Sequence, residues 1–564
     1  MFRRLAAFAL AALPASLLAQ TAPTPKLVVA ISVDQFSADL FAEYRAHFTG
    51  GLKRLADGVV FPSGYQSHAA TETCPGHSTI LTGARPSRTG IIANSWIDQT
   101  ITSRADKGVY CAEDVAKGKS SSSKDYVPST ANLLVPTLGD RMKAINPASR
   151  VVSVAGKDRA AIMLGGSKTD QIWFLNARDY AKFETLAGHA GPVPAAVTKA
   201  NISIEAALKR PMAPYRLSPF CQTRARAVAI NPAKSVGAGA FARPVGDKRM
   251  FRASPEPDVV TATLAGDLIA EMKLGQGTAT DLIAIGMSAT DFVGHSYGTG
   301  GSEMCLQLES LDRQLGALFA RLDKAKIDYV VMLTADHGGH DTPERNDQNA
   351  IPEAARVAET LSARAIGTTI ATELGLAKPA LASSEPSGDV WLDATIPADK
   401  REQALNRAKA LLLANPQVET VFTAAEIEAA AAPAGPPENW GLIQRAKASY
   451  YKGRSGDLVV MLKPRVTPIP LSVAAGTYIA THGSPWDYDR RVPMLFWRKG
   501  LAPFEQPNSV ETVDILPTLA GLIGLQIPNG EIDGRCLDLI AGAGSSCPPE
   551  RKWYIGTDPG PPIR

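Results

Sequence analysis

The chain has 564 residues, of which 45% are apolar and 20% charged, and no low-complexity block, which excludes a disordered or fibrous protein. Lys and Arg number 59 against 55 Asp and Glu, and a net charge of +4 at pH 7 argues against a surface built for nucleic acid or anionic membrane. Histidine is scarce, with 8 residues, so a metal site made of a few histidines would use a visible share of them.

The N-terminus is typical of an export signal. Residues 1–4 carry two arginines, residues 5–18 are apolar but too few to span a bilayer, and residues 19–22 include small side chains suited to cleavage. We expect residues 1–22 to be removed and the protein to be periplasmic or secreted. An uncleaved anchor is the alternative. No later segment has the length and apolarity of a membrane span, so none is expected.

Apolar runs alternate with helical patterns along much of the chain. In chain order the patterns predict a strand at 27–33, a helix at 37–56, a strand at 151–154, a helix at 258–273, a strand at 281–287, a helix near 303–323, strands at 329–334 and 492–497, and a helix at 510–525. Strands rich in Val, Ile and Leu and separated by helices are typical of a parallel sheet covered on both faces. The predicted fold class is therefore α/β, with a mostly parallel central sheet sandwiched by helices.

Three long segments do not continue this alternation, at about 98–147, 165–257 and 343–475. They contain turns rich in Gly, Pro and Ser and some helices of their own. We interpret them as insertions that form a rim over the sheet. Residues 23–545 then form one catalytic domain, followed by a C-terminal tail at 546–564.

Export makes disulfides possible. Cys536 and Cys547 are close in sequence, which favours a local pair. No Cys-x-x-Cys spacing indicates structural zinc, and we interpret the cysteines as structural or inert. Four others allow three pairings, among which the sequence does not choose: Cys74, Cys111, Cys221 and Cys305.

Acidic residues and histidines follow three of the predicted strands. Asp34 follows the first strand, Asp291 and His295 follow the strand at 281–287, and the pair Asp336-His337 follows the strand at 329–334. The carboxyl ends of parallel strands open onto a common cleft, where a buried charge needs a partner or a metal ion. Asp34 and Asp291 could instead cap helices.

His482, in the sequence Thr-His-Gly-Ser, completes a set of three Asp and three His. This mixture of oxygen and nitrogen ligands suits zinc. Six ligands are enough for two cations about 4 Å apart, as in two-metal phosphoryl-transfer sites.

A nucleophile is expected at Thr73, in Thr-Glu-Thr-Cys-Pro-Gly-His-Ser, which precedes an apolar run compatible with a helix. Backbone N–H groups at a helix N-terminus attract anions, and a metal ion can lower the pKa of a hydroxyl. A Thr that caps the helix is the alternative. Cys74 is a rival nucleophile without an evident basic partner. The sulfatase pattern Cys-x-Pro-x-Arg is missing, because Pro75 comes one residue early and Ser78 stands where Arg would be.

Together these motifs resemble the alkaline phosphatase superfamily. Thr-x-Pro-x-His at 73–77, Asn94 and the Asp/His pairs are similar to its nucleotide pyrophosphatase/phosphodiesterase branch and to PafA-like alkaline phosphatases, over about residues 27–525. The resemblance implies an alkaline-phosphatase-like core and two Zn²⁺ ions. It implies one ion on Asp291, His295 and His482, and the other on Asp34, Asp336, His337 and the hydroxyl of Thr73.

Lys157 and Arg159 follow the strand at 151–154 and would lie beside the same cleft. A phosphate monoester carries two charges and a diester one, so two additional cationic donors favour the monoester. PafA-like monoesterases have this pair and an equivalent of Asn94, whereas the diesterases of the superfamily generally lack the pair. A solvated Lys-Asp-Arg turn is the alternative.

We therefore expect an exported zinc-dependent alkaline phosphatase that hydrolyses small phosphate monoesters through a covalent phosphothreonine at Thr73. Asn94, Lys157 and Arg159 would hold the nonbridging oxygens. We expect a monomer, with no nucleic-acid partner. We assign His77 to packing and His340 to a hydrogen bond beside the ligands. The alternatives are a phosphodiesterase or nucleotide pyrophosphatase with the same two-metal site, and an inactive binding protein that retains the fold.

Overall fold

The computed structural model describes residues 24–122, 125–189, 191–351, 353–383, 387–474, 478–542 and 544–548. The predicted export signal at 1–22 and most of the predicted tail at 546–564 lie outside these ranges. Within them, every helix is too short or too polar to cross a bilayer.

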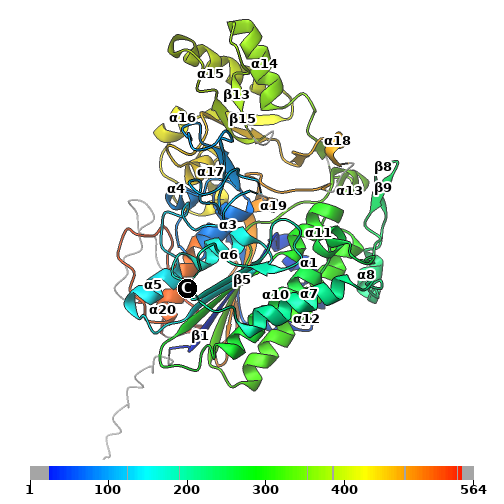
Figure 1. Ribbon diagram of the computed structural model, residues 1–564, viewed down its shortest axis with the longest axis vertical. Coiled ribbons are helices and arrows are strands. Elements are labelled where there is room, and N and C mark those ends of the chain that lie inside the picture. Colours follow the sequence, from blue (N-terminus) through cyan, green and yellow to red (C-terminus); the bar gives the residue numbers. More distant parts are fainter. Residues whose placement is uncertain are drawn as a thin grey trace, which may run out of the picture.

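A ten-stranded sheet lies at the centre of the molecule (Figure 1). The strands on either side of β1 and β10 are parallel, and β18 and β7 are antiparallel to their neighbours, which confirms the predicted α/β class with a mostly parallel sheet. In spatial order the strands are β19 (Phe504–Glu505), β2 (Val59–Tyr65), β18 (Arg491–Arg498), β11 (Tyr329–Thr334), β1 (Leu27–Val33), β10 (Asp281–Met287), β5 (Val151–Ala155), β6 (Gln171–Leu175) and β7 (Phe183–Glu184), with β20 (Val510–Glu511) paired to β2.

Helices cover both faces of this sheet, because alternate residues of β1 enter two separate cores. Val29 and Ile31 pack into one core, and Val28 and Ala30 into the other. The first face is covered by α1 (Ala38–Tyr44), α2 (Gly51–Ala56), α7 (Ala195–Leu208), α10 (Glu256–Glu271) and α12 (Ser302–Lys324). The opposite face is covered by α3 (Thr73–Ile80), α5 (Leu138–Ile145), α6 (Asp158–Gly165) and α20 (Ile515–Leu522) (Figure 1).

The single helix predicted at 37–56 is wrong, because the chain forms α1, a short 3-10 turn and α2. The carboxylate of Asp312, on α12, accepts hydrogen bonds of 2.7 Å from the N–H groups of Thr49, Gly50 and Leu52. These bonds satisfy the free N–H groups at the start of α2. A Cβ at Gly51 would lie 2.4 Å from the Cβ of Leu315, so α2 can approach α12 this closely only with glycine there.

The helix predicted at 510–525 is also shorter than expected. The segment begins with β20, which pairs with Gly64 and Tyr65 of β2, and only α20 is α-helical. Asp514 accepts a hydrogen bond of 2.9 Å from the N–H of Glu511 and so closes the turn between the two elements.

The three segments interpreted as insertions differ in how much they contribute to the core. Residues 98–147 include β4 (Gly108–Tyr110), which pairs with β3 (Ser95–Ile97), and also α5 of the core. Residues 165–257 supply β6 and β7, which extend one edge of the central sheet, and α7, which packs against one of its faces. The physical reason is that β6 is a buried apolar strand that pairs in parallel with β5.

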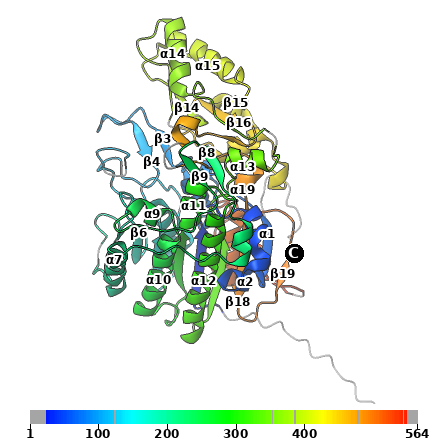
Figure 2. The same cartoon turned by 90° about the vertical axis from the view of Figure 1, so that its right-hand side faces the viewer.

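Residues 355–467 form a small unit of their own, which we name the cap. Its base is a pair of parallel two-residue strands, β12 (Ala355–Arg356) and β17 (Val466–Thr467). The cap stands above the central sheet (Figures 1 and 2). Its sheet consists of β13 (Leu381–Ala382), β14 (Gly388–Leu392), β16 (Leu458–Leu462) and β15 (Val418–Thr423). Its α-helices among the described residues are α14 (Ala363–Leu374), α15 (Ala398–Leu413), α16 (Ala424–Ala429) and α17 (Leu442–Ser449).

Candidate active site

The predicted ligands gather at the carboxyl ends of three adjacent strands. Asp34 follows β1, and Asp336 and His337 follow the neighbouring strand β11. Asp291 and His295 lie on α11 (Ala289–Tyr297), the helix that starts just after β10. His482 comes from the loop that follows the cap, far away in sequence. The parallel order β10-β1-β11 therefore brings these side chains to one edge of the sheet.

The ligand atoms form two overlapping groups. Asp34, Asp336 and His337 place ligand atoms within 4.8 Å of one another, and so do Asp291, His337 and His482. His295 adjoins the second group, because its Nε2 lies 3.2 Å from Oδ1 of Asp291. The rings of His337 and His482 stack with centroids 3.6 Å apart, so the two groups share a boundary.

The three imidazoles are oriented in the same way. Each holds Nδ1 against a backbone carbonyl oxygen, so Nδ1 is the donor and the lone pair of Nε2 faces the site. The pairs and their distances are His295 with Ala480 (2.8 Å), His337 with Gly338 (2.9 Å) and His482 with Thr71 (2.8 Å).

Several buried atoms of the site have no hydrogen-bond partner. They are Oδ1 of Asp34, Oδ1 of Asp291, Oδ2 of Asp336 and Nε2 of His337. A buried acceptor without a donor is costly, and a divalent cation would satisfy all four. Carboxylate oxygen and imidazole nitrogen are ligands that zinc accepts. The residues therefore fit divalent metal ions.

The protonation of the site follows from burial and crowded charge. Burial, and then the charge of Asp336, raise the pKa of Asp34 well above its usual range. Burial lowers the pKa of His337 to about 3, which keeps its ring neutral. Burial alone would raise the pKa of Asp291, but His295 and Lys157 hold it well below its usual range.

Lys157 sits between the two groups of ligands. This residue precedes α6, is 1% exposed, and places Nζ 2.7 Å from Oδ2 of Asp34 and 2.5 Å from Oδ2 of Asp291. Burial would lower the pKa of this ammonium group, but the charges of Asp291 and Asp34 outweigh that effect and raise it. Lys157 is therefore a fixed positive charge at the centre of the site.

Thr73 is the first residue of α3 and lies beside this charge. Its Oγ1 is 3.4 Å from Nζ of Lys157 and 3.4 Å from Nη2 of Arg159. A Cβ at Gly76 would lie 1.9 Å from the carbonyl oxygen of Asp336, so glycine lets α3 rest directly on the backbone of that residue. This close approach brings the hydroxyl to the metal-ligand groups.

Asn94 is held from two sides. Its Oδ1 accepts a hydrogen bond of 2.9 Å from the N–H of Cys74, and its own N–H donates to Oε2 of Glu72 at 2.7 Å. Among the described residues its side-chain NH₂ group has no protein acceptor, and Asn94 lines the cavity of the site. The group can therefore donate to a ligand.

Sequence reasoning missed the residues that support Arg159. The hydroxyl of Tyr110 accepts from Nη1 of Arg159 at 3.4 Å and donates to Oδ1 of Asp158 at 2.9 Å. Tyr126 also donates to Asp158, at 2.6 Å. Burial, and then Asp158, raise the pKa of Tyr110 well above its usual range, so the hydroxyl keeps its proton. No local pattern in the sequence indicates a role for Tyr110. The one available signal is the neighbouring Cys111, since a disulfide there would fix the position of this segment.

Two histidines outside the predicted ligand set lie close to it. His77 is fully buried, with Nδ1 2.9 Å from the carbonyl oxygen of Thr73 and 3.1 Å from Oδ2 of Asp336, so it does more than pack. His340 lines the cavity and places Nε2 3.2 Å from Oγ1 of Thr467.

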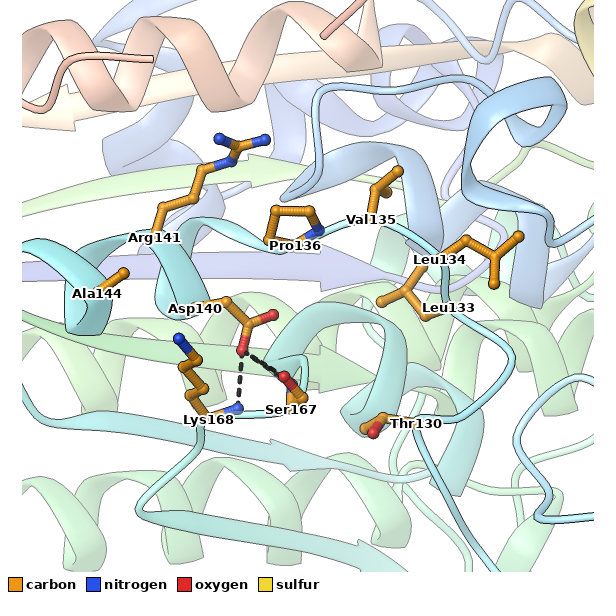
Figure 3. Close-up of a pocket in the computed structure, with 10 residues that line it drawn as sticks. All are labelled: Thr130, Leu133, Leu134, Val135, Pro136, Asp140, Arg141, Ala144, Ser167 and Lys168. Atoms are coloured by element: carbon orange, nitrogen blue, oxygen red, sulfur yellow. Dashed lines mark hydrogen bonds between the residues drawn. The ribbon is translucent and has the colours of Figure 1, made fainter. Parts of the chain in front are cut away.

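A cavity of about 680 Å³ opens from the ligands toward the cap. Arg159, His295 and His482 line it from the core side, and Asp389 and Trp391 from the cap. A second hollow of about 450 Å³ lies beside α5 (Figure 3) and contains none of the predicted site residues. There Asp140 accepts hydrogen bonds from Ser167 and Lys168, so its charge has a structural role.

Comparison with known families decides the family. Residues 28–483 match the family described as type I phosphodiesterase / nucleotide pyrophosphatase. The chain belongs to this family. The likeness of its motifs to this branch and to PafA-like alkaline phosphatases is therefore confirmed.

Several proteins similar to this chain are named alkaline phosphatases. The chain is 56% identical to alkaline phosphatase PhoK of Sphingomonas sp., over 93% of each protein. It is 49% identical to alkaline phosphatase PhoD of Zymomonas mobilis, over 93% of this chain and 89% of that one. A crystal structure of alkaline phosphatase PafA shares the fold, with a TM-score of 0.79 at 24% identity over 92% of this chain and 100% of that one. The chain is thus an enzyme of the alkaline phosphatase group.

Proposed function

We propose that the protein is an exported, zinc-dependent phosphate monoesterase that acts through a covalent phosphothreonine at Thr73. The observation that carries the proposal is the position of Lys157 and Arg159, which both lie 3.4 Å from Oγ1 of Thr73. Relatives named alkaline phosphatases at 49% and 56% identity support the same reading.

The metal ligands follow from the two groups of side chains. Asp291, His295 and His482 would hold one zinc ion, and Asp34, Asp336, His337 and the hydroxyl of Thr73 the other. When bound, two zinc ions lower the pKa of a hydroxyl and offset the negative charge on the leaving oxygen.

Thr73 supplies the nucleophile. Its Oγ forms a bond to phosphorus while the ester P–O bond breaks and the alcohol departs. Water then attacks the phosphothreonine, releases inorganic phosphate and regenerates the hydroxyl. Thr73 stands at the start of α3, where the helix dipole favours an anion.

Three side chains would hold the nonbridging oxygens. Lys157 contributes a buried ammonium group, Arg159 a guanidinium group fixed by Tyr110, and Asn94 a free NH₂ group. Two cations match the two charges of a monoester, whereas a diester has one charge and a second substituent that would crowd these donors.

Two substrates that share a leaving group test the proposal. We expect kcat/KM for 4-nitrophenyl phosphate to exceed that for methyl 4-nitrophenyl phosphate by at least 100-fold, with about two zinc ions bound per chain. Lys157→Ala or Arg159→Ala should reduce monoester turnover much more than diester turnover. Thr73→Ala should abolish the phosphoenzyme that acid quenching traps, while Thr73→Ser should retain it. Equal or better turnover of the diester would contradict the monoesterase proposal.

The same measurement decides the second candidate, a phosphodiesterase or nucleotide pyrophosphatase. The description of the matching family favours that candidate. It would become the better reading if Lys157→Ala and Arg159→Ala affected both substrates equally.

Export is proposed on two grounds. The first 22 residues are typical of an export signal. All six cysteines form disulfides, which persist in oxidising compartments: Cys74–Cys111, Cys221–Cys305 and Cys536–Cys547. N-terminal sequencing of protein recovered from the periplasm or medium should show cleavage close to residue 22.

A further inference from the structure

Three aromatic side chains form one wall of the cavity beside Asp291 and His295. Phe292 follows Asp291 directly, and the ring of Tyr478 stacks on the imidazole of His295 with centroids 4.5 Å apart and planes inclined by 26°. Tyr180 meets Phe292 edge to face at 5.1 Å. All three rings line the cavity. Tyr180 and Tyr478 are partly exposed and Phe292 is 2% exposed behind them, so a substrate next to these ligands would contact mainly the two tyrosine rings.

This aromatic wall is held in place from behind. The guanidinium group of Arg252, on α9 (Lys248–Arg252), lies 5.2 Å from the ring centroid of each of the three residues and hydrogen-bonds to the hydroxyl of Tyr478. Lys157 lies 5.1 Å from the centroid of Phe292. Arg252 is not among the residues that line the cavity, so the rings separate its charge from a bound substrate. Rings fixed by cations in this way form a preorganised surface.

The charges that line the rest of the cavity are mostly negative. Among the described lining residues, Arg159 is the sole Lys or Arg, and its guanidinium group is next to Thr73. Glu72 and Asp489 also line the cavity, as does Asp389 of the cap. Burial raises the pKa of Asp389 to about 7, the N–H of Gly456 opposes the shift and Glu72 adds to it, so Asp389 is ionised at alkaline pH.

We propose that the side of the cavity formed by Phe292, Tyr478 and Tyr180 is a leaving-group subsite for uncharged aromatic or apolar alcohols. Monoesters whose alcohol carries a further negative charge are then poor substrates. The inference rests on the proposed function. There Thr73 belongs to the group of Asp34, Asp336 and His337, so an in-line attack makes the alcohol depart on the side of Asp291, His295 and His482. Aromatic rings stack on the wall, whereas an additional anion meets Asp389 and Glu72 and finds no unengaged cation.

Two nearly isosteric substrates test the charge preference. We expect kcat/KM for 3-carbamoylphenyl phosphate to exceed that for 3-carboxyphenyl phosphate by at least tenfold in the wild-type holoenzyme at pH 9. Asp389→Asn should reduce this ratio at least threefold, while Glu402→Gln, an exposed acid on α15 of the same cap, should leave it unchanged. Equal kcat/KM values for the two substrates would overturn the proposal. Failure to hydrolyse either one, with turnover of a diester, would instead contradict the proposed function.

The aromatic contact is tested separately, without turnover. Phenylphosphonate should bind to the holoenzyme at least fivefold more tightly than methylphosphonate in isothermal titration calorimetry. Tyr478→Ala should abolish most of this difference and Tyr478→Phe should retain it, with thermal unfolding of each variant as the control for folding. An unchanged difference in folded Tyr478→Ala would overturn the assignment of the subsite to this wall.

Discussion

Cys74, the neighbour of the proposed nucleophile, is disulfide-bonded to Cys111, the neighbour of Tyr110. The N–H of Cys111 also donates to the carbonyl oxygen of Asn94 at 3.0 Å, and the N–H of Cys74 donates to the side chain of Asn94. One covalent bond thus joins the start of α3 to the strand that supports Arg159. Cys74 is thus not a free thiol, and the interpretation of this cysteine as structural or inert is confirmed.

Removal of this disulfide should lower activity. The bond closes a segment with a sequence separation of 37, and loss of the constraint costs about 4 kcal/mol of stability in the chain-entropy account. We expect the double variant Cys74→Ser/Cys111→Ser to lose at least tenfold in monoester kcat/KM at a temperature where it remains folded. The matched control is Cys221→Ser/Cys305→Ser, which removes a longer-range disulfide outside the site. Equal losses in both double variants would show that the effect is general destabilisation.

Tyr110→Phe should weaken monoester turnover while leaving the fold intact. The change removes the hydroxyl between Arg159 and Asp158, so the guanidinium group loses a fixed neighbour. We expect a five- to tenfold lower kcat/KM for 4-nitrophenyl phosphate and a smaller effect on its methyl diester. Tyr126→Phe is the control, because among the described residues the hydroxyl of Tyr126 bonds to Asp158, whereas that of Tyr110 bonds to both Asp158 and Arg159. The same loss in both variants would show that the effect comes from Asp158 and would contradict a direct role of the Tyr110 hydroxyl in holding Arg159.

Removal of metal should destabilise the protein without unfolding it. Asp34, Asp291 and Asp336 would remain close together, but Lys157 still pairs with two of these carboxylates. A ligand at 100 times its Kd contributes about 2.7 kcal/mol, and the unfolding entropy of a chain of this length is about 1 kcal/mol per K, so loss of each ion should lower Tm by roughly 2 to 3 °C. Scanning calorimetry with EDTA and then with added Zn²⁺ should show a reversible change. A Tm that changes neither with EDTA nor with added Zn²⁺ would contradict the metal assignment.

Asp258→Asn should stabilise the protein at high pH. The buried Asp258 accepts hydrogen bonds from the N–H of Ala289 at 2.9 Å and from Gln307 at 2.8 Å, and burial raises its pKa from 3.8 to about 6. Because the folded state holds this proton more tightly, its stability falls as pH rises through the window from about 4 to about 6 and then stays lower. The full effect is on the order of 3 kcal/mol.

Denaturant unfolding of the chelated wild type and Asp258→Asn at pH 4 and pH 8 measures this effect. We expect the variant to gain relative to the wild type between the two pH values, since Asn has no charge to bury. The amide oxygen of Gln307, which is buried without a hydrogen-bond partner, could turn toward the new NH₂ group. A difference in stability that is identical at both pH values would contradict the assignment.

The parts of the fold that depend on local pattern could be predicted from the sequence. The apolar run of β1 ends just before Asp34 and that of β11 just before Asp336, so each strand and its predicted ligand are close in the chain. The rule that parallel strands expose their carboxyl ends to one cleft then brings ligands of distant segments together.

Features that depend on distant contacts could not be predicted. The break before α2 is made by Asp312, about 260 residues further along the chain. Tyr110 acquires its role only because β3 and β4 fold back over α6, which no local periodicity indicates. β7 is two residues long, too short for any pattern. Pairing of the four scattered cysteines likewise required the tertiary structure.

The base of the cap separates the predicted metal ligands from one part of the cavity lining. Ala355 pairs with Val466 and Arg356 with Thr467, so the chain leaves the core and returns to it at one place. The predicted metal ligands, Lys157 and the aromatic wall all lie outside residues 355–467, whereas Asp389 and Trp391 lie on β14 of the cap. Exchange of residues 355–467 for the corresponding segment of a relative therefore needs two junctions that lie side by side, and must keep the hydrogen bonds that Arg445 and Ser449 accept from Ala69. Such chimaeras would exchange the negative charge that Asp389 adds to the cavity while keeping the aromatic wall and the proposed catalytic residues.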